Sequence, residues 1–378
     1  MNIHWVGTGL SAIPGLRRLI DSGAPVFVWN RTVEKARAEV GDLTGEIREY
    51  SPEALEAVVS RGDVVVSMLP ADQHVPLARM AIAKGAHFVS SSYVSPEMAA
   101  LDAEARAAGV ALVNEVGLDP GIDHLMAHDL VDDYRQVAQP GDVVRFTSYC
   151  GGVPAKANSF RYKFSWSPLG VLRALRSPSR SLRGGAVRDV ARPWHAIEAY
   201  QAPLPEPETF EVYPNRDSLP FVRQYGFDEA WDVQDFVRGT IRLQGWQQVW
   251  TPVFSEIETL EGPAGETRLR EMADQFWREN SYAEGEPDRV VLFVALRAER
   301  GGQVIWDKEW VLDAQGNDQG SAMAQLVSVP VALAVETLRE GRLPTGVQAA
   351  PHDPALVRDW LDKVAGIAQH MDKVDHLA

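Results

Sequence analysis

The sequence predicts an α/β protein with an N-terminal doubly wound parallel sheet and a second α+β domain built on a mixed sheet. Through the first 117 residues, strand-like runs alternate with helix-like stretches, which is typical of a parallel sheet covered by helices on both faces. A glycine-rich turn follows the first run. From about residue 140 the connections lengthen and proline becomes more frequent, and nine of the eleven tryptophans lie beyond residue 160.

The first domain contains six predicted strands: Ile3–Val6, Pro25–Trp29, Glu46–Tyr50, Asp63–Met68, His87–Ser91 and Val110–Glu115. Two of the helices between them open with Ser-Pro-Glu, at Ser51 and at Ser95. In this motif serine caps free N–H groups, proline fits the first helical position, and glutamate suits the positive end of the helix. The alternation therefore has defined helix starts as well as strands.

In the second domain the predicted strands are Val143–Tyr149, Phe236–Leu243, Val290–Ala298 and Val304–Leu312, the last two joined as a hairpin. Residues 184–207 and 260–266 are interpreted as loops or insertions. We expect a first domain of residues 1–120, completed by C-terminal helices in residues 321–378. Residues 121–320 would form the substrate domain.

Composition limits the possible partners. The net charge of −15 argues against binding to nucleic acid or to an anionic membrane. The single cysteine, Cys150, excludes an intramolecular disulfide, and no signal peptide precedes the first strand, so a cytoplasmic location is expected. The apolar segment 322–338 is interrupted by Gln325, Pro330 and Glu336, which indicates a buried helix rather than a membrane span.

The glycine turn reads Gly7-Thr8-Gly9-Leu10-Ser11-Ala12 and has the G-x-G-x-x-A form of the Rossmann dinucleotide fingerprint. Gly7 allows a tight turn, and Gly9 lets the backbone approach a pyrophosphate, which the helix N-terminus then binds. Ala12 keeps the helix close to the sheet. With a strand before it and a helix after it, this turn predicts a dinucleotide site.

The end of the second strand indicates which dinucleotide binds. An NAD site places an acidic residue there, about 20 residues past the glycines, on the ribose 2′-hydroxyl. This chain has Asn30-Arg31-Thr32 instead. Asn30 is neutral, and the planar guanidinium of Arg31 suits a 2′-phosphate. The sequence therefore favours NADP over NAD.

Polar residues follow the later strands, where an open α/β sheet binds its ligands. The fourth strand ends near Leu69, which should line the nicotinamide side of the cleft, and Ser92-Tyr93 follows the fifth strand. Ser92 and Tyr93 suit a carboxylate or an amine, or they are a capping serine and a packed tyrosine. Asp119, in the loop before the next helix, is either a catalytic base or part of a stabilising Asp-Pro turn.

Two further candidates have ordinary structural interpretations. His124 and His128 stand one helical turn apart, but no glutamate adjoins His124 and the chain has one cysteine, so packing or capping is favoured over a metal site. Cys150 lies at a strand end before two glycines. A nucleophilic cysteine needs a nearby base, and none is evident, so Cys150 is interpreted as a wall of the site.

Together these residues resemble the saccharopine dehydrogenase family, in its NADP-dependent, L-glutamate-forming branch. The matching blocks occur in family order across nearly the whole chain, and they are far more specific than the glycine fingerprint. They are residues 7–14, 92–98, 114–125, 148–154, 162–167, 213–218, 237–240 with 244–245, and 320–324. Residues 155–161 and 191–210 depart from the family pattern, which bears on the substrate more than on the fold.

The resemblance implies oxidation of saccharopine at its secondary amine, with hydride passing to NADP and water splitting the imine into glutamate and aminoadipate semialdehyde. The reverse reaction is a reductive condensation. The implied substrate contacts are Ser92, Tyr93, Asp119, Cys150, Arg216 and Thr240. The implied NADP contacts are Gly7 to Leu10, Arg31, Thr32, and the turn formed by Leu118, Asp119 and Pro120. A homodimer is also implied.

Physical chemistry is consistent with these implied roles. A substrate with three carboxylates needs charge-assisted donors, for which Arg216 is the first candidate, with Arg238 and Arg242 in reserve. For the catalytic base, Asp119 is the first candidate, followed by Lys163 and Tyr93. Two alternatives remain: a related carboxynorspermidine-type polyamine enzyme, and a catalytically silent NADP-binding regulatory protein.

Overall fold

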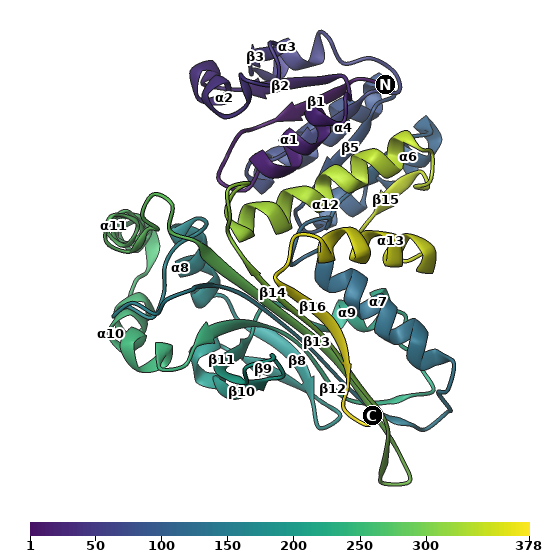
Figure 1. Ribbon diagram of the computed structural model, residues 1–378, viewed down its shortest axis with the longest axis vertical. Helices are drawn as coiled ribbons and strands as arrows, with labels where there is room; N and C mark the ends of the chain where they lie inside the picture. The colour runs from purple at the N-terminus through teal and green to yellow at the C-terminus, as the bar shows by residue number, and fades with distance from the viewer. The chain divides into compact units, whose positions relative to one another are not determined.

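The computed structural model describes all 378 residues, and the chain divides into two compact units. The first unit comprises Met1–Leu125 and Asp318–Ile367, and the second comprises Met126–Asn317 and Ala368–Ala378 (Figure 1). Each unit is therefore built from two separate segments of the sequence. The C-terminal segment is divided between them, whereas the sequence assigned all of residues 321–378 to the first domain.

The first unit is built on a seven-stranded sheet in which every pairing is parallel. From one edge to the other its strands are β15 (Gly346–Gln348), β6 (Ala111–Val113), β5 (His87–Ser90), β4 (Val64–Ser67), β1 (Ile3–Val6), β2 (Val26–Asn30) and β3 (Ile47–Glu49). The strand order reverses between β1 and β4, which is the doubly wound arrangement expected from the sequence. All six predicted strands are present.

Helices cover this sheet and bury its apolar strands. They are α1 (Ile13–Asp21), α2 (Val33–Val40), α3 (Pro52–Glu56), α4 (His74–Lys84), α5 (Pro96–Ala99), α6 (Asp102–Ala108), α12 (Ala322–Arg339) and α13 (Pro354–Ala365), with a 3-10 turn, η1 (Ala71–Gln73), before α4. Both Ser-Pro-Glu starts are confirmed, because Ser51 accepts a hydrogen bond from the Ala54 N–H and Ser95 accepts one from the Met98 N–H. Helix α7 (Ile122–Arg135) begins in the first unit and continues into the second.

Helix α12 lies against α1 through a close contact at one glycine (Figure 1). The Gly15 N–H donates to the Ser328 hydroxyl at 2.8 Å. A Cβ atom on Gly15 would lie 2.0 Å from the Ser328 carbonyl oxygen, so only glycine permits this approach. The ion pair between Arg18 and Glu336 joins the same helices at 2.9 Å.

Helix α12 is also long and apolar enough, by length and composition, to cross a membrane. However, 78% of its apolar window is buried inside the structure. It fits the buried helix that the sequence predicted, and its apolar residues form part of the core of the first unit.

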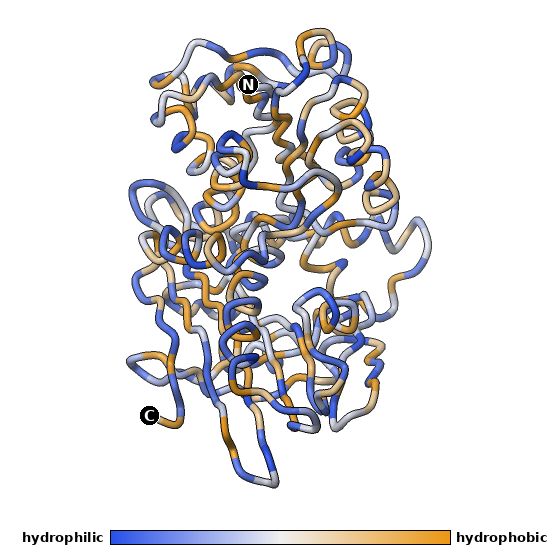
Figure 2. Tube along the Cα trace, turned by 90° about the vertical axis from the view of Figure 1, so that its right-hand side faces the viewer, coloured by the Kyte–Doolittle hydropathy of each residue, from blue (hydrophilic) through white to orange (hydrophobic).

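The second unit is built on a mixed nine-stranded sheet. Its main path runs β10 (Glu198–Ala202), β11 (Glu208–Pro214), β12 (Asp232–Leu243), β7 (Val143–Pro154), β13 (Asp288–Arg300), β14 (Gln303–Gln315) and β16 (His370–Asp375), with β8 (Ser179–Arg183) and β9 (Ala186–Val190) attached beside β12. The β12–β7 pair is parallel, and the neighbouring pairs along the path are antiparallel. The predicted β13–β14 hairpin is present, with a hydrophilic tip (Figure 2).

Helices α8 (Pro168–Arg176), α10 (Trp246–Glu258) and α11 (Gly262–Asn280) enclose an aromatic core that includes Tyr162, Phe164, Trp246 and Trp250. The short helices α9 (Leu219–Gln224) and η2 (Pro193–Ala196) complete the unit.

Three predictions for the second unit were wrong. Residues 184–207, interpreted as a loop or insertion without strands, contain β9 and β10, whose side chains are mostly exposed and therefore lack an alternating apolar pattern. Residues 260–266, also interpreted as a loop, contain the start of α11, where Pro263 lies in the first turn that tolerates proline. Residues 370–375 were included in the C-terminal helices expected over residues 321–378, but they form the strand β16. This strand is held by pairing with β14 and by Lys373, whose ammonium lies 2.7 Å from Asp129 and 2.6 Å from Asp133.

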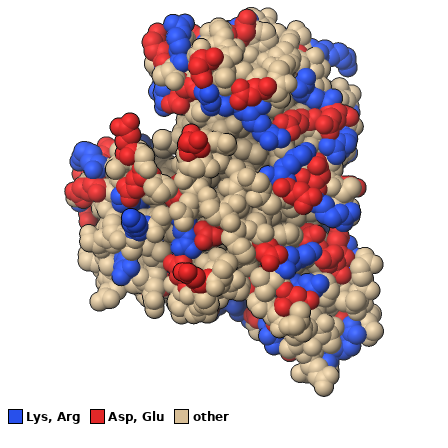
Figure 3. All heavy atoms as spheres, viewed as in Figure 1, with Lys and Arg blue, Asp and Glu red and all other residues tan.

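On the face of the molecule shown in Figure 3, acidic and basic side chains are interspersed. Many surface arginines pair with carboxylates, as Arg17 does with Asp42 at 2.6 Å. Cations that have no such partner are therefore informative about where anionic ligands bind.

Candidate functional site

The glycine turn of the first unit has the geometry that a dinucleotide pyrophosphate requires. Gly7 has a φ of +102°, and an added Cβ would lie 3.2 Å from the Met68 carbonyl oxygen, so both backbone conformation and space favour glycine. A Cβ on Gly9 would meet no protein atom within 4 Å. Because the protein does not fill this space, the absence of a side chain at Gly9 leaves room for a ligand.

This turn lines a cavity of about 540 Å³ at the carboxyl ends of the strands. Seven of the predicted cofactor contacts line it: Gly7, Thr8, Gly9, Asn30, Arg31, Thr32 and Leu69. The cavity is completed by Trp29, Lys35, Tyr50, Met68, Pro70, Asp72 and Gln73. The other predicted contacts, Leu10, Leu118, Asp119 and Pro120, are not among its lining residues.

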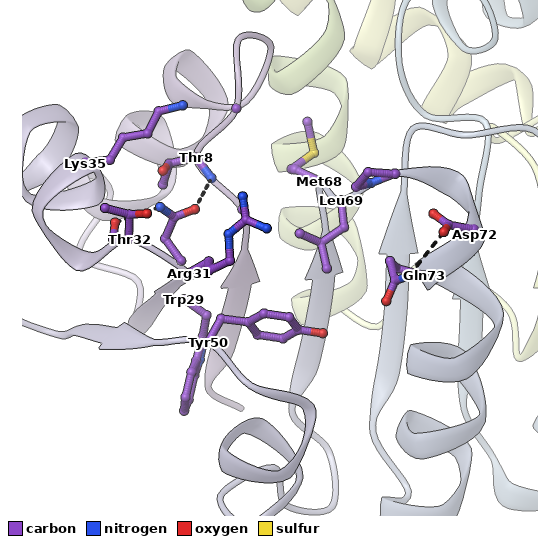
Figure 4. Close-up of a pocket in the computed structure, with 14 residues that line it drawn as sticks. Thr8, Trp29, Arg31, Thr32, Lys35, Tyr50, Met68, Leu69, Asp72 and Gln73 are labelled. Carbon is purple, nitrogen blue, oxygen red and sulfur yellow. Dashed lines mark hydrogen bonds between the residues drawn. The ribbon is translucent and has the colours of Figure 1, made fainter. Parts of the chain in front are cut away.

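Two cations without carboxylate partners stand at this cavity. Arg31 and Lys35 are both exposed, and neither makes an ion pair within the chain. In Figure 4 the Arg31 guanidinium extends from the end of β2 into the space between the glycine turn and Leu69. The Lys35 ammonium adds a second positive charge from the first turn of α2. This is the electrostatic environment that a 2′-phosphate needs.

The residues present fit NADP on two further observations. The Thr8 hydroxyl is buried and has no hydrogen-bond partner in the chain, so an acceptor or donor is missing beside the glycine turn. Thr32 is the N-cap residue of α2, yet its side chain makes no capping hydrogen bond. Its hydroxyl and the adjacent helix N-terminus are thus available to an anion.

Sequence reasoning missed Lys35 and Tyr50. Lys35 lies in the first turn of the helix that starts at Val33, directly after the segment that carries Arg31, and a cation in this first turn was a usable signal. Tyr50 follows β3, the strand beside β2, and becomes a lining residue through sheet order.

Beyond this cavity, a group of hydroxyls follows the ends of β4 and β5. The His74 ring lies between two serines, with Nδ1 3.0 Å from the Ser67 hydroxyl and Nε2 2.9 Å from the Ser92 hydroxyl. Burial lowers the pKa of His74 to about 4, so the ring is neutral near pH 7. Ser92 was a predicted substrate contact, and His74 was missed.

Tyr93 and Asp119 are brought together in the first unit. The Tyr93 hydroxyl donates to Asp119 Oδ1 at 2.8 Å. The sequence indicated both as catalytic candidates without placing them in contact. Their contact would allow a proton to pass between the phenol and the carboxylate.

Acidic and imidazole groups lie beneath the Asp119 loop. Glu115 has a φ of +56°, unusual for a residue other than glycine, and its carboxylate accepts from the Val94 N–H at 2.9 Å. His124 is fully buried, with Nε2 3.0 Å from Glu115 and Nδ1 3.4 Å from Asp123. The burial and the two carboxylate contacts of His124 indicate a structural role for this residue. No group of three or more His, Cys, Asp or Glu side chains is arranged to hold a metal ion.

In the second unit, Cys150 and Thr240 are neighbours on paired strands, so their side chains share one face of the sheet. Cys150 is buried. The Thr240 hydroxyl accepts from the Asn215 amide at 2.7 Å. Asn215 therefore links Thr240 to the turn that carries Arg216.

Arg216 follows β11 in a strained backbone conformation, with a φ of +52°. Its carbonyl accepts from the Arg180 N–H at 2.8 Å, and the Asn215 N–H donates to the Arg238 carbonyl at 3.1 Å. These backbone bonds fix the turn on β12 and β8. The Arg216 side chain is exposed.

Arg242, only a reserve candidate in the sequence, has the more unusual environment. It is 5% exposed, and its guanidinium lies over the rings of Tyr162, Trp246 and Tyr213, at 4.7, 5.4 and 5.6 Å. It makes no ion pair, and its Nε has no partner. Its cross-strand neighbour Glu211 instead accepts from the N–H groups of Gly245 and Gln247. A buried cation without a carboxylate is costly, so this site favours an anionic ligand.

Lys163 has the environment of a charge partner rather than that of a catalytic base. Its ammonium donates to both carboxylate oxygens of Glu286 at 2.6 Å and lies 5.6 Å from the Tyr282 ring. A lysine held in this way balances the charge of Glu286. Among the three candidates for the catalytic base, this geometry favours Asp119 with Tyr93.

The fold and cavity define a Rossmann-type dinucleotide-binding protein with an additional α+β unit. Residues 3–113 match the model of the saccharopine dehydrogenase NADP binding domain, and residues 117–367 match that of the saccharopine dehydrogenase C-terminal domain. The chain belongs to the saccharopine dehydrogenase family. The predicted family and NADP cofactor are thereby confirmed.

Curated relatives agree with this assignment. The chain is 39% identical over 258 residues to saccharopine dehydrogenase [NADP(+), L-glutamate-forming] of Pyricularia oryzae, a match that covers 65% of this chain and 55% of the relative. The enzyme of the same name from Saccharomyces cerevisiae is 35% identical over 262 residues, 65% of this chain and 56% of the relative. The matches thus span about half the length of these relatives.

Solved structures extend the likeness to the whole fold. Apo saccharopine dehydrogenase (L-Glu forming) from Saccharomyces cerevisiae aligns with a TM-score of 0.83 at 26% identity, covering 99% of both chains. A homospermidine synthase from Legionella pneumophila, solved in complex with NAD, aligns with a TM-score of 0.64 at 9% identity, covering 99% of this chain and 91% of that one. The second likeness concerns the fold alone.

Proposed function

We propose that this protein is an NADP-dependent oxidoreductase that acts on the secondary amine of saccharopine. It converts saccharopine, NADP and water into L-glutamate, aminoadipate semialdehyde and NADPH, or catalyses the reverse. The observation that carries this proposal is the match of two consecutive saccharopine dehydrogenase domain models over residues 3–113 and 117–367. The cations without carboxylate partners in both units support it, since cofactor and substrate are anions.

In the first unit, this chain would hold NADP through the glycine turn, with Arg31, Thr32 and Lys35 at the 2′-phosphate. The nicotinamide supplies a hydride acceptor or donor when it is bound. The buried Thr8 hydroxyl would then find its missing partner beside the pyrophosphate.

For the substrate, we propose that cationic and hydroxyl side chains hold the three carboxylates. Arg216 and Arg242 would each bind a carboxylate, and Arg242 gains most because its guanidinium is already desolvated by aromatic rings. Ser92, Thr240 and Cys150 would complete the contacts.

Proton transfer is assigned to the Tyr93–Asp119 pair. Loss of hydride from the carbon beside the amine leaves an iminium, and addition of water followed by C–N cleavage gives the amine and the aldehyde. Asp119, hydrogen-bonded to Tyr93 at 2.8 Å, would accept the proton of the attacking water, and Tyr93 would orient the carboxylate.

The test follows NADPH absorbance with purified protein, saccharopine and NADP, repeated with Arg216→Ala. Loss of a hydrogen bond to a charged group, of about 1.5–3 kcal/mol, should lower kcat/KM by about tenfold or more. Arg223→Ala, an exposed arginine on the neighbouring helix α9, is the matched control and should leave turnover unchanged. NADPH binding without turnover in the wild type would refute the saccharopine assignment.

The cellular setting is also part of the proposal. A net charge of −15 and one buried cysteine support a cytoplasmic enzyme that does not bind nucleic acid or membranes. We propose a homodimer, as the family resemblance implies. Light scattering coupled to gel filtration tests it, and a mass of one chain at micromolar concentration would contradict it.

A further inference from the structure

Three side chains from separate segments form a hydrogen-bonded chain at the ligand-binding edge of the first sheet. Ser67 ends β4, His74 begins α4, and Ser92 follows β5. The two imidazole nitrogens lie 3.0 Å from Ser67 Oγ and 2.9 Å from Ser92 Oγ. His74 is 5% exposed and Ser67 is 1% exposed, so water hardly competes for these bonds.

The protonation state of His74 determines which groups donate and which accept in the two hydrogen bonds among Ser67, His74 and Ser92. Burial lowers the pKa of His74 to about 4, and the neutral ring has one N–H donor and one acceptor nitrogen. If Nδ1 carried the proton, Ser92 would donate to Nε2 and could only accept from a ligand. If Nε2 carries the proton, Ser67 donates to Nδ1 and His74 donates to Ser92. The Ser92 hydroxyl can then donate its own hydrogen bond to the ligand.

The proposed substrate selects between these two arrangements. Its carboxylates are acceptors, so a useful Ser92 hydroxyl must donate. A serine hydroxyl rotates about its C–O bond, and His74 is the only hydrogen-bond partner of the Ser92 hydroxyl within the chain. The imidazole therefore decides whether Ser92 meets a carboxylate as a donor.

We propose that His74 is a positioning residue that, in its Nε2–H form, holds the Ser92 hydroxyl as a donor to a substrate carboxylate, while Ser67 donates to Nδ1. This inference rests on the proposed function, in which Ser92 contacts the substrate.

His87 provides a matched control. It is a second histidine of the first unit and is partly buried, its pKa is also lowered by burial, and its Nδ1 accepts from the Ala111 N–H at 3.0 Å. It begins β5, at the amino ends of the strands, whereas Ser92 follows the carboxyl end of the same strand. A histidine substitution that acts only through stability should have similar consequences at either position.

The kinetic experiment compares His74→Phe, His74→Gln, Ser92→Ala, the double variant His74→Phe/Ser92→Ala, and His87→Phe. Loss of a hydrogen bond to a charged group lowers kcat/KM for saccharopine by about tenfold to a hundredfold. We expect that loss in His74→Phe and in Ser92→Ala, with KM for NADP unchanged. The double variant should be no worse than either single variant, because both remove the same contact.

The glutamine variant is the rescue, since its amide nitrogen can donate to Ser92 from the position of Nε2. It should recover most of the lost kcat/KM. Additive losses in the double variant, or an equal loss in His87→Phe, would show that His74 acts through general stability, and the inference would be wrong. If the wild type turns over saccharopine and His74→Phe has an unchanged kcat/KM, the inference is overturned and the proposed function stands.

A second measurement does not depend on turnover. In ¹⁵N-resolved NMR of the whole protein, His74 should remain neutral from pH 6 to pH 8 as the Nε2–H tautomer, and its Nε2 signal should move in Ser92→Ala. An Nδ1–H tautomer would overturn the inference, whether or not saccharopine proves to be the substrate.

Discussion

Both units contain cationic side chains that have no carboxylate partner, but those in the first unit are exposed and the one in the second unit is buried. At the cofactor cavity, Arg31 and Lys35 are exposed and close together in sequence. In the second unit, Arg242 is 5% exposed beneath aromatic rings, with residues from three segments around it. An exposed cation binds an anion weakly, because water and salt compete. A desolvated cation binds strongly, and leaving it empty costs stability. The first arrangement suits a cofactor that must leave, and the second suits selection among substrates.

The largest expected effect is at the buried cation. Arg242→Gln should lower kcat/KM for saccharopine by a factor that corresponds to about 2–5 kcal/mol, because a desolvated charged contact is lost. The control is Arg268→Gln, which removes a partly exposed arginine of α11 that pairs with Glu256 of α10 and Glu271 of α11, and it should change little. Steady-state kinetics and melting temperatures measure both. Equal losses in the two variants would mean that burial of Arg242 has no special role.

A smaller effect should separate stability from binding at two glycines of the first unit. Gly15→Ala would force a Cβ within 2.0 Å of the Ser328 carbonyl, so we expect a loss of about 1–3 kcal/mol in unfolding free energy. Gly9→Ala meets no protein atom within 4 Å, so stability should hold while NADPH binding weakens. Gly45→Ala, also without nearby atoms, is the control for both. Normal NADPH affinity in Gly9→Ala would contradict the cavity assignment.

Each of the exposed cations, Arg31 and Lys35, should contribute less to cofactor binding than the buried Arg242 contributes to substrate binding. Arg31→Ala should weaken NADP binding by about 1–2 kcal/mol, and Lys35→Ala by somewhat less, because solvent screens both. NAD binding should be unchanged, since NAD lacks the 2′-phosphate. Fluorescence titration with both reduced cofactors measures this, and parallel losses for the two cofactors would argue against a 2′-phosphate site.

The smallest expected effect is a difference in salt dependence. Raising ionic strength from about 0.05 to 0.5 M shortens the screening length severalfold, so KM for NADP should rise more than KM for saccharopine. If KM for saccharopine rose more steeply, the exposed Arg216 rather than the buried Arg242 would dominate substrate binding.

What the sequence determined by itself is local. The glycine turn, the six first-domain strands and the Ser-Pro-Glu helix starts follow from backbone preferences within a few residues. The family blocks are likewise continuous stretches. For this reason the position of Arg31 at the cofactor cavity follows from its place just after the second strand.

Only the tertiary structure decided the contacts between distant segments. Gly15 meets Ser328 across 313 residues, His74 lies between two strand ends, and Arg242 is enclosed by rings from other elements. The exposed strands β9 and β10 carry no apolar alternation, and β16 is held by its neighbours. Such features depend on which surfaces pack together, and packing is a property of the whole chain that no short window of residues specifies.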